Sequence, residues 1–571
     1  MDKKLLRQLW MHISKKKKLY CGLLLILMCI TSITEIISIG SVLPFLAALT
    51  SPEKIYNNIA LKKIWQILNV KSQQELLLPL TAFFALSSIS AGFLRVLVLK
   101  LSTNIAFIIG SDISSKIYHR TLYQAYSIHI SRNTSEIISS LTGKTNGVIL
   151  GVINPILIFI NSIFIIVTML LAFLYIQTEV TILCFSTISG IYLTITYFSR
   201  KQKIKNSKNI SIESTNVVKI IQEGLGAIRD ILISGNQEIY MEAYKTAEHT
   251  LRKAQASNIF VSQCPRYGIE TVGMLGIAFI AYSTVNNSLS IIDVIPLLGT
   301  LAIAMQRMLP VMQQAYASFS SIQGSHQILE DTINLLNQKI PKENSLANNK
   351  PVIFRNEIYL KNISFRYSLT TPWVLRNFSL KIKKGERIGI KGTSGKGKST
   401  LVDILMGLLT PNEGVFLIDG EEITSKNKRG WQKNIAHVPQ FIYLSDSSIQ
   451  ENIAFGVPKE DINMQKLLQA SRMANIRETI DILKDKYETI VGENGIKLSG
   501  GQRQRIGIAR ALYKDANIIF FDEATSALDN KTENEIMNVI DSLSKELTIV
   551  IIAHRNSTLK KCSRIIDLSK I

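Results

Sequence analysis

Long apolar stretches alternate with polar, helix-compatible stretches through the first 335 residues of the chain. Six apolar stretches are long enough to cross about 30 Å of hydrocarbon as helices. They lie near residues 19–49, 76–101, 152–175, 180–198, 266–285 and 289–312. The polar stretches 102–150 and 200–262 predict that these helices continue beyond the membrane as stalks. Each stalk should close in a turn, near Tyr126–Glu136 and near Ala227–Glu238, where polar and small residues interrupt the apolar pattern.

A change of composition near residues 340–351 separates this helical part from the rest. The segment is rich in Asn, Lys and Pro and loses its periodicity, as a linker does. Short β-prone runs such as Arg387–Lys391 follow it. We therefore expect a transmembrane domain over residues 1–335, a linker over 336–351 and a nucleotide-binding domain over 352–571.

Basic residues gather at the ends of the predicted spans and indicate their orientation. Lys15–Lys18 precede the first span, and a cluster from Arg200 to Lys208 follows the fourth. The excess of Lys and Arg on the cytosolic side of membrane proteins places both termini and the C-terminal domain in the cytosol. The external segment 51–75 has apolar residues at helical spacing and predicts an amphipathic helix. Such a helix either contacts a lipid tail or only covers the ends of its neighbours.

The overall charge and the cysteines narrow the class of protein. The 571 residues include 65 Lys plus Arg and 43 Asp plus Glu, for a net charge of +22. This balance suits nucleic acid or an anionic membrane face, and the apolar runs favour the membrane; we expect no nucleic-acid partner. The five cysteines lack disulfide or metal spacing. The first apolar run predicts a retained anchor without a preceding protease domain, which argues against a leader-cleaving peptide exporter.

A glycine-rich run in the second part fits the pattern G-x-x-x-x-G-K-[ST]. Its glycines let backbone N–H groups close around phosphates, Lys398 reaches the outer phosphates, and the Ser399 hydroxyl binds Mg²⁺. The predicted nucleotide-binding residues are Gly392, Thr393, Ser394, Gly395, Lys396, Gly397, Lys398, Ser399 and Thr400. The run alone indicates only some P-loop nucleoside triphosphatase (NTPase).

A second run, Leu498–Gln502, is more specific. Ser499, Gly500, Gly501 and Gln502 stand at the start of a helix-compatible stretch that reaches Leu512. The free N–H groups and the dipole at a helix N-terminus favour an anion. Two phosphate sites in one domain predict a composite active site.

Further polar residues fit the same chemistry. Asn517–Phe521 reads as a buried strand that ends at Asp522 and Glu523, so Asp522 is the predicted Mg²⁺ ligand and Glu523 the base that polarises the attacking water. Gln440 is a candidate for contact with Mg²⁺ or that water, and His554 for the γ-phosphate. Tyr367 either stacks on adenine or simply packs.

In this order the motifs resemble those of the ABC transporter superfamily, over nearly the whole chain. The resemblance implies an α-helical six-span transmembrane domain of exporter type joined to an α/β P-loop ABC ATPase domain. It also implies ATP and Mg²⁺ as ligands and a homodimer through both domains, in which the Gly392–Thr400 run of one copy meets the Leu498–Gln502 run of the other. The chain ends soon after His554, so no regulatory tail is expected.

Three arginines lie inside or beside the apolar runs: Arg95, Arg266 and Arg307. Charged side chains in membrane spans usually face a cavity, a partner or a substrate, and guanidinium binds two phosphate oxygens at once. The arginines are therefore candidate substrate residues. Alternatively they reach the membrane surface, or pair structurally with Glu35 and Glu270.

The membrane half is similar to PglK-type flippases of lipid-linked oligosaccharides. Similar strings occur at Ser135–Gly143, Pro265-Arg266, Glu270–Gly273 and Arg307–Pro310. The resemblance implies ATP-driven flipping of a polyprenyl-pyrophosphate oligosaccharide, a lipid-linked anionic substrate, across the bacterial cytoplasmic membrane. One alternative is an exporter of a peptide or small amphipathic molecule, and another is an ATP-gated channel or sensor on the same scaffold.

Overall fold

The computed structural model divides the chain into two compact units. It describes residues 3–50, 52–56, 72–176, 178–286, 291–340, 351–523, 535, 537–540, 546–553, 555, 559–560 and 562–570. The first unit comprises residues 1–122 and 132–339, and the second comprises 123–131 and 340–571. Residues 336–339, which the sequence assigns to the linker, thus cluster with the first unit. The rest of the expected linker, apart from Ile340 and Pro351, lies outside the described residues.

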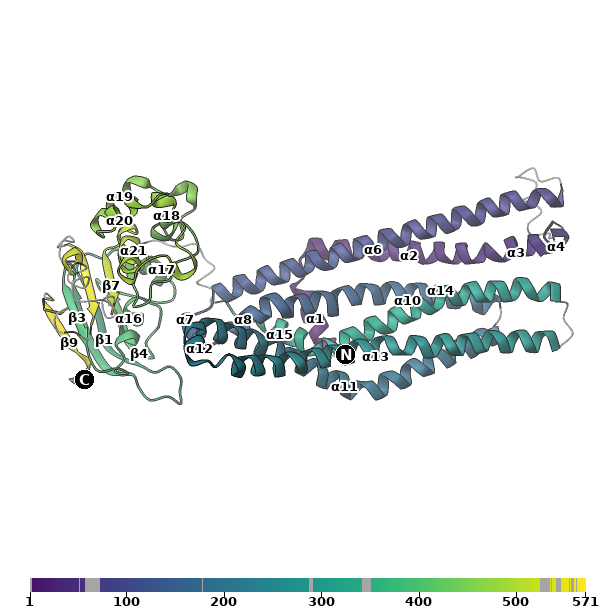
Figure 1. Ribbon diagram of the computed structural model, residues 1–571, viewed down its shortest axis with the longest axis horizontal. Helices are drawn as coiled ribbons and strands as arrows, with labels where there is room; N and C mark the ends of the chain where they lie inside the picture. The colour runs from purple at the N-terminus through teal and green to yellow at the C-terminus, as the bar shows by residue number, and fades with distance from the viewer. Residues whose placement is uncertain are drawn as a thin grey trace. The chain divides into compact units, whose positions relative to one another are not determined.

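The first unit is a set of long helices that lie side by side, with α2 beside α6, α10 beside α14, and α11 beside α13 (Figure 1). Its described helices are α1 (Lys3–His12), α2 (Lys15–Gly40), α3 (Val42–Thr50), α4 (Pro52–Tyr56), a 3₁₀ helix (Gln73–Leu76), α6 (Leu77–Leu122), α8 (Thr134–Ser139), α9 (Thr145–Val148), α10 (Asn154–Ile176), α11 (Thr178–Gly226), α12 (Ile228–Ser234), α13 (Gln237–Asn286), α14 (Ile291–Gly324) and α15 (His326–Leu336).

The described parts of the six predicted spans are helical. Among the described residues, three helical regions are long and apolar enough to cross a membrane: Lys15–Leu49, Leu77–Leu122 and Thr134–Leu174. The helices α6 and α11 end at Leu122 and Gly226, close to the two turns that the polar pattern predicts. Most of the predicted external helix 51–75 lies outside the described residues, so this prediction stays open.

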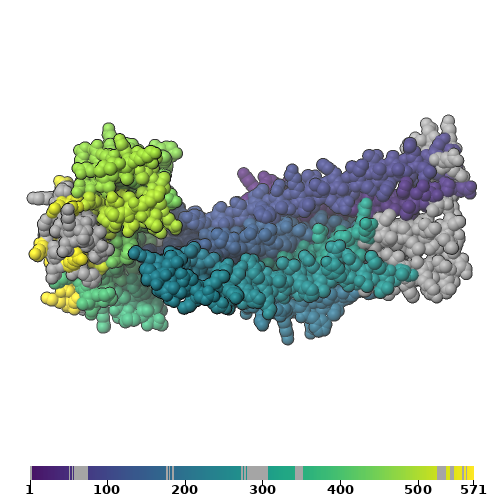
Figure 2. All heavy atoms as spheres, in the orientation of Figure 1, coloured from purple at the N-terminus to yellow at the C-terminus, as the bar shows by residue number. Residues whose placement is uncertain are grey.

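The helix α6 lies on the surface of the first unit (Figure 2), and exposed residues along it form an apolar stripe. Leu86, Ile89, Phe93 and Val96 recur at helical spacing and have exposed fractions of 66–69%. The opposite side of the same helix contributes Ile113, which is 1% exposed, to a core shared with α2 and α15. An apolar stripe outside a packed core is what a helix in contact with lipid or with a second chain presents.

Two π-helical segments, Ser140–Lys144 and Ile149–Ile153, interrupt the helix between α8 and α10. Glycines permit close packing here. A Cβ added at Gly110 of α6 would lie 2.2 Å from Ile149 Cδ1, and one added at Gly151 would lie 2.1 Å from Ser325 Oγ, between α14 and α15. Neither distance leaves room for a methyl group, so a larger residue at either position would force the Ile149 or Ser325 side chain to move.

The second unit contains two sheets. An antiparallel sheet has the order β2-β1-β4-β5, and a parallel sheet has the order β6-β7-β8-β3-β9. The strands are β1 (Glu357–Phe365), β2 (Leu375–Lys383), β3 (Arg387–Lys391), β4 (Glu413–Ile418), β5 (Glu421–Glu422), β6 (Ile435–Val438), β7 (Ile518–Asp522), β8 (Thr548–Ile552) and β9 (Arg564–Asp567).

The described α-helices of the second unit are α7 (Tyr126–Ser131), α16 (Lys398–Leu405), α17 (Lys428–Gln432), α18 (Ile449–Ile453), α19 (Met464–Met473), α20 (Arg477–Ile482) and α21 (Gly500–Tyr513). All but α7, which has no buried residue, contribute to its apolar cores. The central residues of the parallel sheet are apolar and covered on both faces: Ile388, Phe520 and Val550 are at most 1% exposed.

Candidate functional site

The parallel sheet brings distant motifs to one edge. Strands β3 and β7 both pair with β8, and Ile390 and Asp522 are both in register with Ile552. The strand β6 adds Val438 on the other side of β7. Since the carboxyl ends of parallel strands meet at one edge, the Gly392–Thr400 run, Gln440 and the Asp522-Glu523 pair lie at the same end of the sheet.

The Gly392–Thr400 run forms a tight loop that leads into α16. Gly395 and Gly397 each have φ of +81°, and a Cβ at Gly397 would lie 2.8 Å from Val374 Cγ1. Only glycine adopts this backbone without strain. Lys398 is 7% exposed, and its ammonium donates to the Gly392 carbonyl at 2.9 Å. The loop thus holds a cation beside its own backbone, while Thr393, Ser394, Lys396 and Ser399 are exposed.

Two acidic residues stand at the end of β7, as the pattern predicts: Asp522 is the last residue of the strand, and Glu523 follows it. Burial raises the pKa of Asp522, the charge of Glu523 raises it further, and Lys398 opposes the rise. Glu523 has φ of +47°, an uncommon conformation for a side chain of this kind, and its N–H donates to the Ile552 carbonyl at 3.0 Å. The Gln440 amide donates to Glu523 Oε2 at 3.1 Å. The two residues predicted to handle the water are therefore in direct contact.

The Leu498–Gln502 run begins α21 as expected, with a different role for one residue. The Ser499 hydroxyl accepts from the Gln502 N–H at 3.3 Å, and the Gln502 side chain accepts from the Ser499 N–H at 2.8 Å. This reciprocal pair caps the helix. The Gln502 side chain is thus occupied by the cap, whereas Gly500 and Gly501 keep their backbone at the start of the helix, where an anion is favoured.

The two remaining sequence candidates differ in what the structure shows. The Tyr367 ring is half exposed and packs edge-on against Phe365 at 5.1 Å between centroids, while its hydroxyl lies 2.9 Å from Thr400 Oγ1. Packing and an open ring face therefore coexist at Tyr367. His554 lies outside the described residues.

Two residues near this edge were not singled out from the sequence. The Gln504 amide donates to the Gln440 carbonyl at 3.2 Å and so joins α21 to the segment that holds Gln440. Gln504 could have been identified from the sequence as a polar residue on the buried face of a helix, at helical spacing from Ile508 and Ala511. Asp403 of α16 is the second: burial, followed by the charge of Asp522, raises its pKa to about 6.

In the first unit, two of the three arginines meet at one acid. Glu35 of α2 is 3% exposed, and its carboxylate lies 2.8 Å from Arg95 Nε and 3.2 Å from Arg307 Nη1. Arg307 also donates to the Ser38 hydroxyl at 3.0 Å. One carboxylate thus faces two guanidinium groups, so this Glu35 cluster keeps one net positive charge.

Arg266 is placed differently. It pairs with Glu270 one turn along α13, with 2.6 Å between Nε and Oε1, and its side chain is 58% exposed. The pairing with Glu35 and Glu270 that the sequence left as an alternative is therefore present at all three arginines. The structure does not bring Arg266 into the Glu35 cluster.

Comparisons with known proteins agree with this architecture. The family model described as ABC transporter transmembrane region matches residues 18–318, which is more than half of the chain, and the model described as ABC transporter matches residues 375–526.

Among curated relatives, the leukotoxin export ATP-binding protein LtxB of Aggregatibacter actinomycetemcomitans is 36% identical over 59% of this chain and 50% of its own length. The ATP-dependent lipid A-core flippase of Alkalilimnicola ehrlichii is 28% identical over 80% of this chain and 77% of its own length. The chain spans half or less of the length of the first relatives it matches.

A solved structure supports the same fold. The structure of a bacterial Atm1-family ABC exporter with ATP bound matches with a TM-score of 0.72 and 22% identity, covering 93% of each chain. A helical transmembrane domain and an ABC ATPase domain stand in the same chain. The chain therefore belongs to the ABC transporter family, with the fold of an exporter-type half-transporter.

Proposed function

We propose that this protein is an ATP-driven transporter that flips a lipid-linked anionic glycan, a polyprenyl-pyrophosphate oligosaccharide, across the bacterial cytoplasmic membrane. The observation that carries the cargo proposal is the Glu35 cluster. Its single carboxylate leaves one of two guanidinium charges without compensation, inside a bundle of apolar helices. Such a surplus charge attracts an anionic headgroup. The flippase among the relatives, which is named for lipid A-core, supports a lipid cargo.

The ATPase half would supply the driving force. The residues at the sheet edge fit Mg-ATP, because the exposed Ser399 hydroxyl and the Asp522 carboxylate are oxygen donors of the kind Mg²⁺ prefers. When bound, Mg²⁺ neutralises phosphate charge. The Lys398 ammonium would donate to phosphate oxygens in place of the Gly392 carbonyl. The half-exposed Tyr367 ring would stack on adenine. Glu523, oriented by Gln440, would accept the proton of the attacking water.

We further propose a homodimer, in which the Ser499–Gly501 backbone of one copy completes the phosphate site of the other. A feature of α12 supports a second copy. Ile228, Leu232 and Ile233 have exposed fractions of 46%, 59% and 76%, although α12 lies far from the predicted spans in sequence. Apolar residues exposed outside a membrane usually meet a partner surface. Both termini and the ATPase domain would be cytosolic, with residues 1–335, 336–351 and 352–571 as the domains.

A second candidate is export of a polypeptide. It is favoured by the relative named as a leukotoxin exporter, which is 36% identical over 59% of the chain. The two cargoes differ in whether a lipid headgroup crosses the membrane while its tail remains there.

The test is headgroup translocation in proteoliposomes that contain a fluorescent polyprenyl-pyrophosphate oligosaccharide. We expect ATP-dependent flipping in the wild type, and its loss in both Glu523→Gln and Arg307→Ala. Arg307→Ala should keep basal ATPase activity, because it lies outside the ATPase domain. Arg252→Ala, which removes an exposed arginine paired with Glu248, is the matched control and should flip normally. ATPase activity without flipping in the wild type would reject the lipid cargo and favour polypeptide export.

A further inference from the structure

A second basic site lies in the first unit, where α11 faces the junction of α14 and α15. A pocket of about 430 Å³ opens there, lined by Arg200, Lys203, Lys208, Gln323, His326 and Glu330, among others. This volume is within the range of small-molecule sites. We call it the Lys203 pocket. It is separate from both the sheet edge and the Glu35 cluster, because it shares no residue with either.

Lys203 is the unusual member of this pocket. Its side chain is 1% exposed, and its ammonium has no hydrogen-bond acceptor among the described residues. The ring of Tyr316 lies 5.3 Å from the ammonium and offers only a weak attraction. Burial lowers the pKa of Lys203 to about 8. A buried ammonium without an acceptor is costly, and such groups are normally paired. The missing partner is therefore an anion or another acceptor that the described residues do not supply.

The charges around the pocket favour an anion. Arg200 and Lys208 line it together with Lys203, and neither has an ion pair within the parts of the chain that the structure describes. Glu330 is the opposing carboxylate, and it already accepts from the Gln327 amide at 3.1 Å. Three cations thus face one acid whose hydrogen bonding is partly satisfied.

The backbone adds to this polarity. The helix α15 begins at His326, beside the pocket, and the Gln327 N–H in its first turn donates to the buried Ser207 hydroxyl at 2.9 Å. This bond fixes the start of an eleven-residue helix against α11. The positive end of its dipole faces the same region as the cations, which favours negative charge there.

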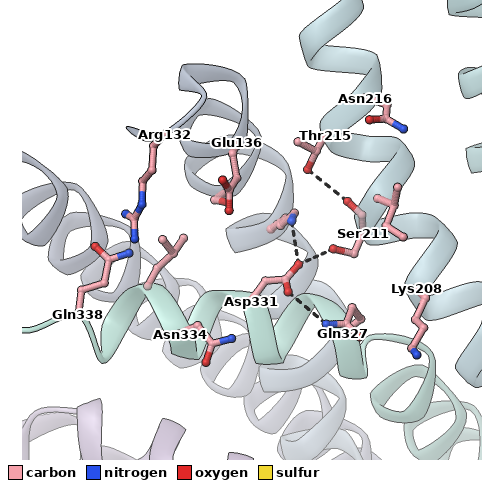
Figure 3. Close-up of a pocket in the computed structure, with 14 residues that line it drawn as sticks. Arg132, Glu136, Lys208, Ser211, Thr215, Asn216, Gln327, Asp331, Asn334 and Gln338 are labelled. Atoms are coloured by element: carbon pink, nitrogen blue, oxygen red, sulfur yellow. Dashed lines mark hydrogen bonds and ion pairs between the residues drawn. The ribbon is translucent and has the colours of Figure 1, made fainter. Parts of the chain in front are cut away.

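A neighbouring pocket extends the space. It has a volume of about 590 Å³ and shares Lys208 and Gln327 with the Lys203 pocket (Figure 3). Arg132, in the bend before α8, and Asn334 of α15 line it. In its wall, Asp331 accepts from Lys144 at 2.7 Å and from Gln327 at 3.2 Å. The wall is therefore held in place, and the two pockets together can accept an anion that carries a polar extension.

We propose that the Lys203 pocket binds a phosphate-bearing anion, which Arg200 and Lys208 contact and whose charge compensates the buried Lys203 ammonium. Phosphate fits because it offers several acceptor oxygens to an ammonium and a guanidinium at once. The same chemistry is present in the headgroup of an anionic membrane lipid and in a soluble phosphate ester. The proposal does not depend on which cargo the protein moves.

The test uses the purified full-length protein in nanodiscs of phosphatidylcholine, with Mg-ADP in excess so that the Gly392–Thr400 loop is occupied. Inorganic pyrophosphate is the probe, and its Kd is measured by calorimetry. We expect Lys203→Met to weaken binding by about tenfold or more, the effect of removing a nearby positive charge from a region of low dielectric constant. Lys208→Gln should weaken it less. Lys201→Met, which removes an exposed lysine on the same helix, is the matched control and should bind as the wild type does.

A second readout separates ligand binding from packing. Without ligand, Lys203→Met should melt at or above the wild-type temperature, because it removes an unpaired buried charge while keeping an apolar stem of similar length. Equal pyrophosphate affinity in wild type and Lys203→Met would exclude a soluble phosphate ester as the ligand of this pocket. Nanodiscs that also contain phosphatidylglycerol then test the lipid source, and stabilisation of the wild type alone would assign the site to a headgroup. No difference between the two proteins with either probe overturns the proposal.

Discussion

The phosphate loop of the second unit and the Glu35 cluster of the first unit both hold cationic side chains, and they hold them in different ways. The buried Lys398 donates to the carbonyl oxygen of Gly392, a neutral group, and its charge also opposes the rise in the pKa of Asp522. The side chains of Arg95 and Arg307 are 50% and 22% exposed, and they share the negative charge of the buried Glu35. A cationic side chain therefore indicates ligand binding only after its partners in the fold are known.

The largest expected effect tests the phosphate side of this comparison. Glu523→Gln keeps the shape of the side chain but cannot accept a proton, so ATP hydrolysis should fall about 10²–10⁴-fold, the contribution usual for a general base. Phosphate release at saturating ATP measures it. Glu421→Gln, on the exposed strand β5, is the control and should hydrolyse ATP at the wild-type rate. A wild-type rate in Glu523→Gln would place water activation on another residue.

The second-largest expected effect is a loss of stability at the Glu35 cluster. Glu35→Gln leaves two partly exposed guanidinium groups without their buried acid, and it should lower the unfolding free energy by about 1.5–3 kcal/mol, the contribution of hydrogen bonds to a charged group. Thermal denaturation in detergent measures the change. Glu270→Gln removes the acid of the exposed Arg266 pair and should cost less than about 1 kcal/mol, since exposed pairs contribute little. Equal losses in the two variants would show that the Glu35 cluster is not a stabilising centre.

Asp331 of α15 is a further paired charge, and the stability that it contributes to the fold depends on pH. Burial by itself would raise the pKa of Asp331, but hydrogen bonds from Lys144 and Ser211 together bring the pKa below its ordinary value of 3.8. The stabilisation is therefore present above about pH 4 and is lost as pH falls through the lower folded pKa. Asp331→Asn should lower the free energy of unfolding at pH 7 by about 2 kcal/mol. The melting temperature should fall accordingly.

The gap between Asp331→Asn and wild type should narrow below pH 4. Asp230→Asn, in the short helix α12, provides the control because Asp230 forms no ion pair with any of the described residues. A gap that stays constant down to pH 3 would mean that the Asp331 carboxylate is not the source of the stabilisation.

The smallest effect separates capping from phosphate binding in the second unit. Gln502→Ala removes half of the reciprocal cap with Ser499 and should cost about 1 kcal/mol of stability. Gln502→Glu keeps an acceptor for the Ser499 N–H and should retain stability and nucleotide affinity. If Gln502→Glu loses nucleotide binding while remaining folded, the side chain contacts phosphate directly and the capping role is secondary.

Much of the fold could be predicted because it rests on local patterns. Apolar runs of membrane length predict the long helices, and the strands β3 and β7 follow from short apolar runs before the glycine-rich loop and before Asp522. The sheet edge is also predictable, since parallel strands place their carboxyl ends together. Local patterns repeat within one element, and this is why they can be read from one sequence.

The rest depends on contacts between distant elements. Glu35, Arg95 and Arg307 come from three helices and have no common spacing, so their convergence could be listed only as one alternative. The role of Gln502 as a cap was missed because its motif is associated with phosphate. Lys203 appeared in the sequence merely as part of a basic cluster, and its burial against Tyr316 follows from packing alone.

The π-helical segments Ser140–Lys144 and Ile149–Ile153 change the direction in which the side chains beyond them face around the helix axis. Each residue of an α-helix advances about 100° around the axis, and a π turn holds one residue more than an α turn, so each segment moves the downstream face by about that angle. A pattern of apolar positions extended backward from α10 to α8 therefore names the wrong side of the helix. Deleting one residue within either segment would restore regular winding and rotate everything beyond it.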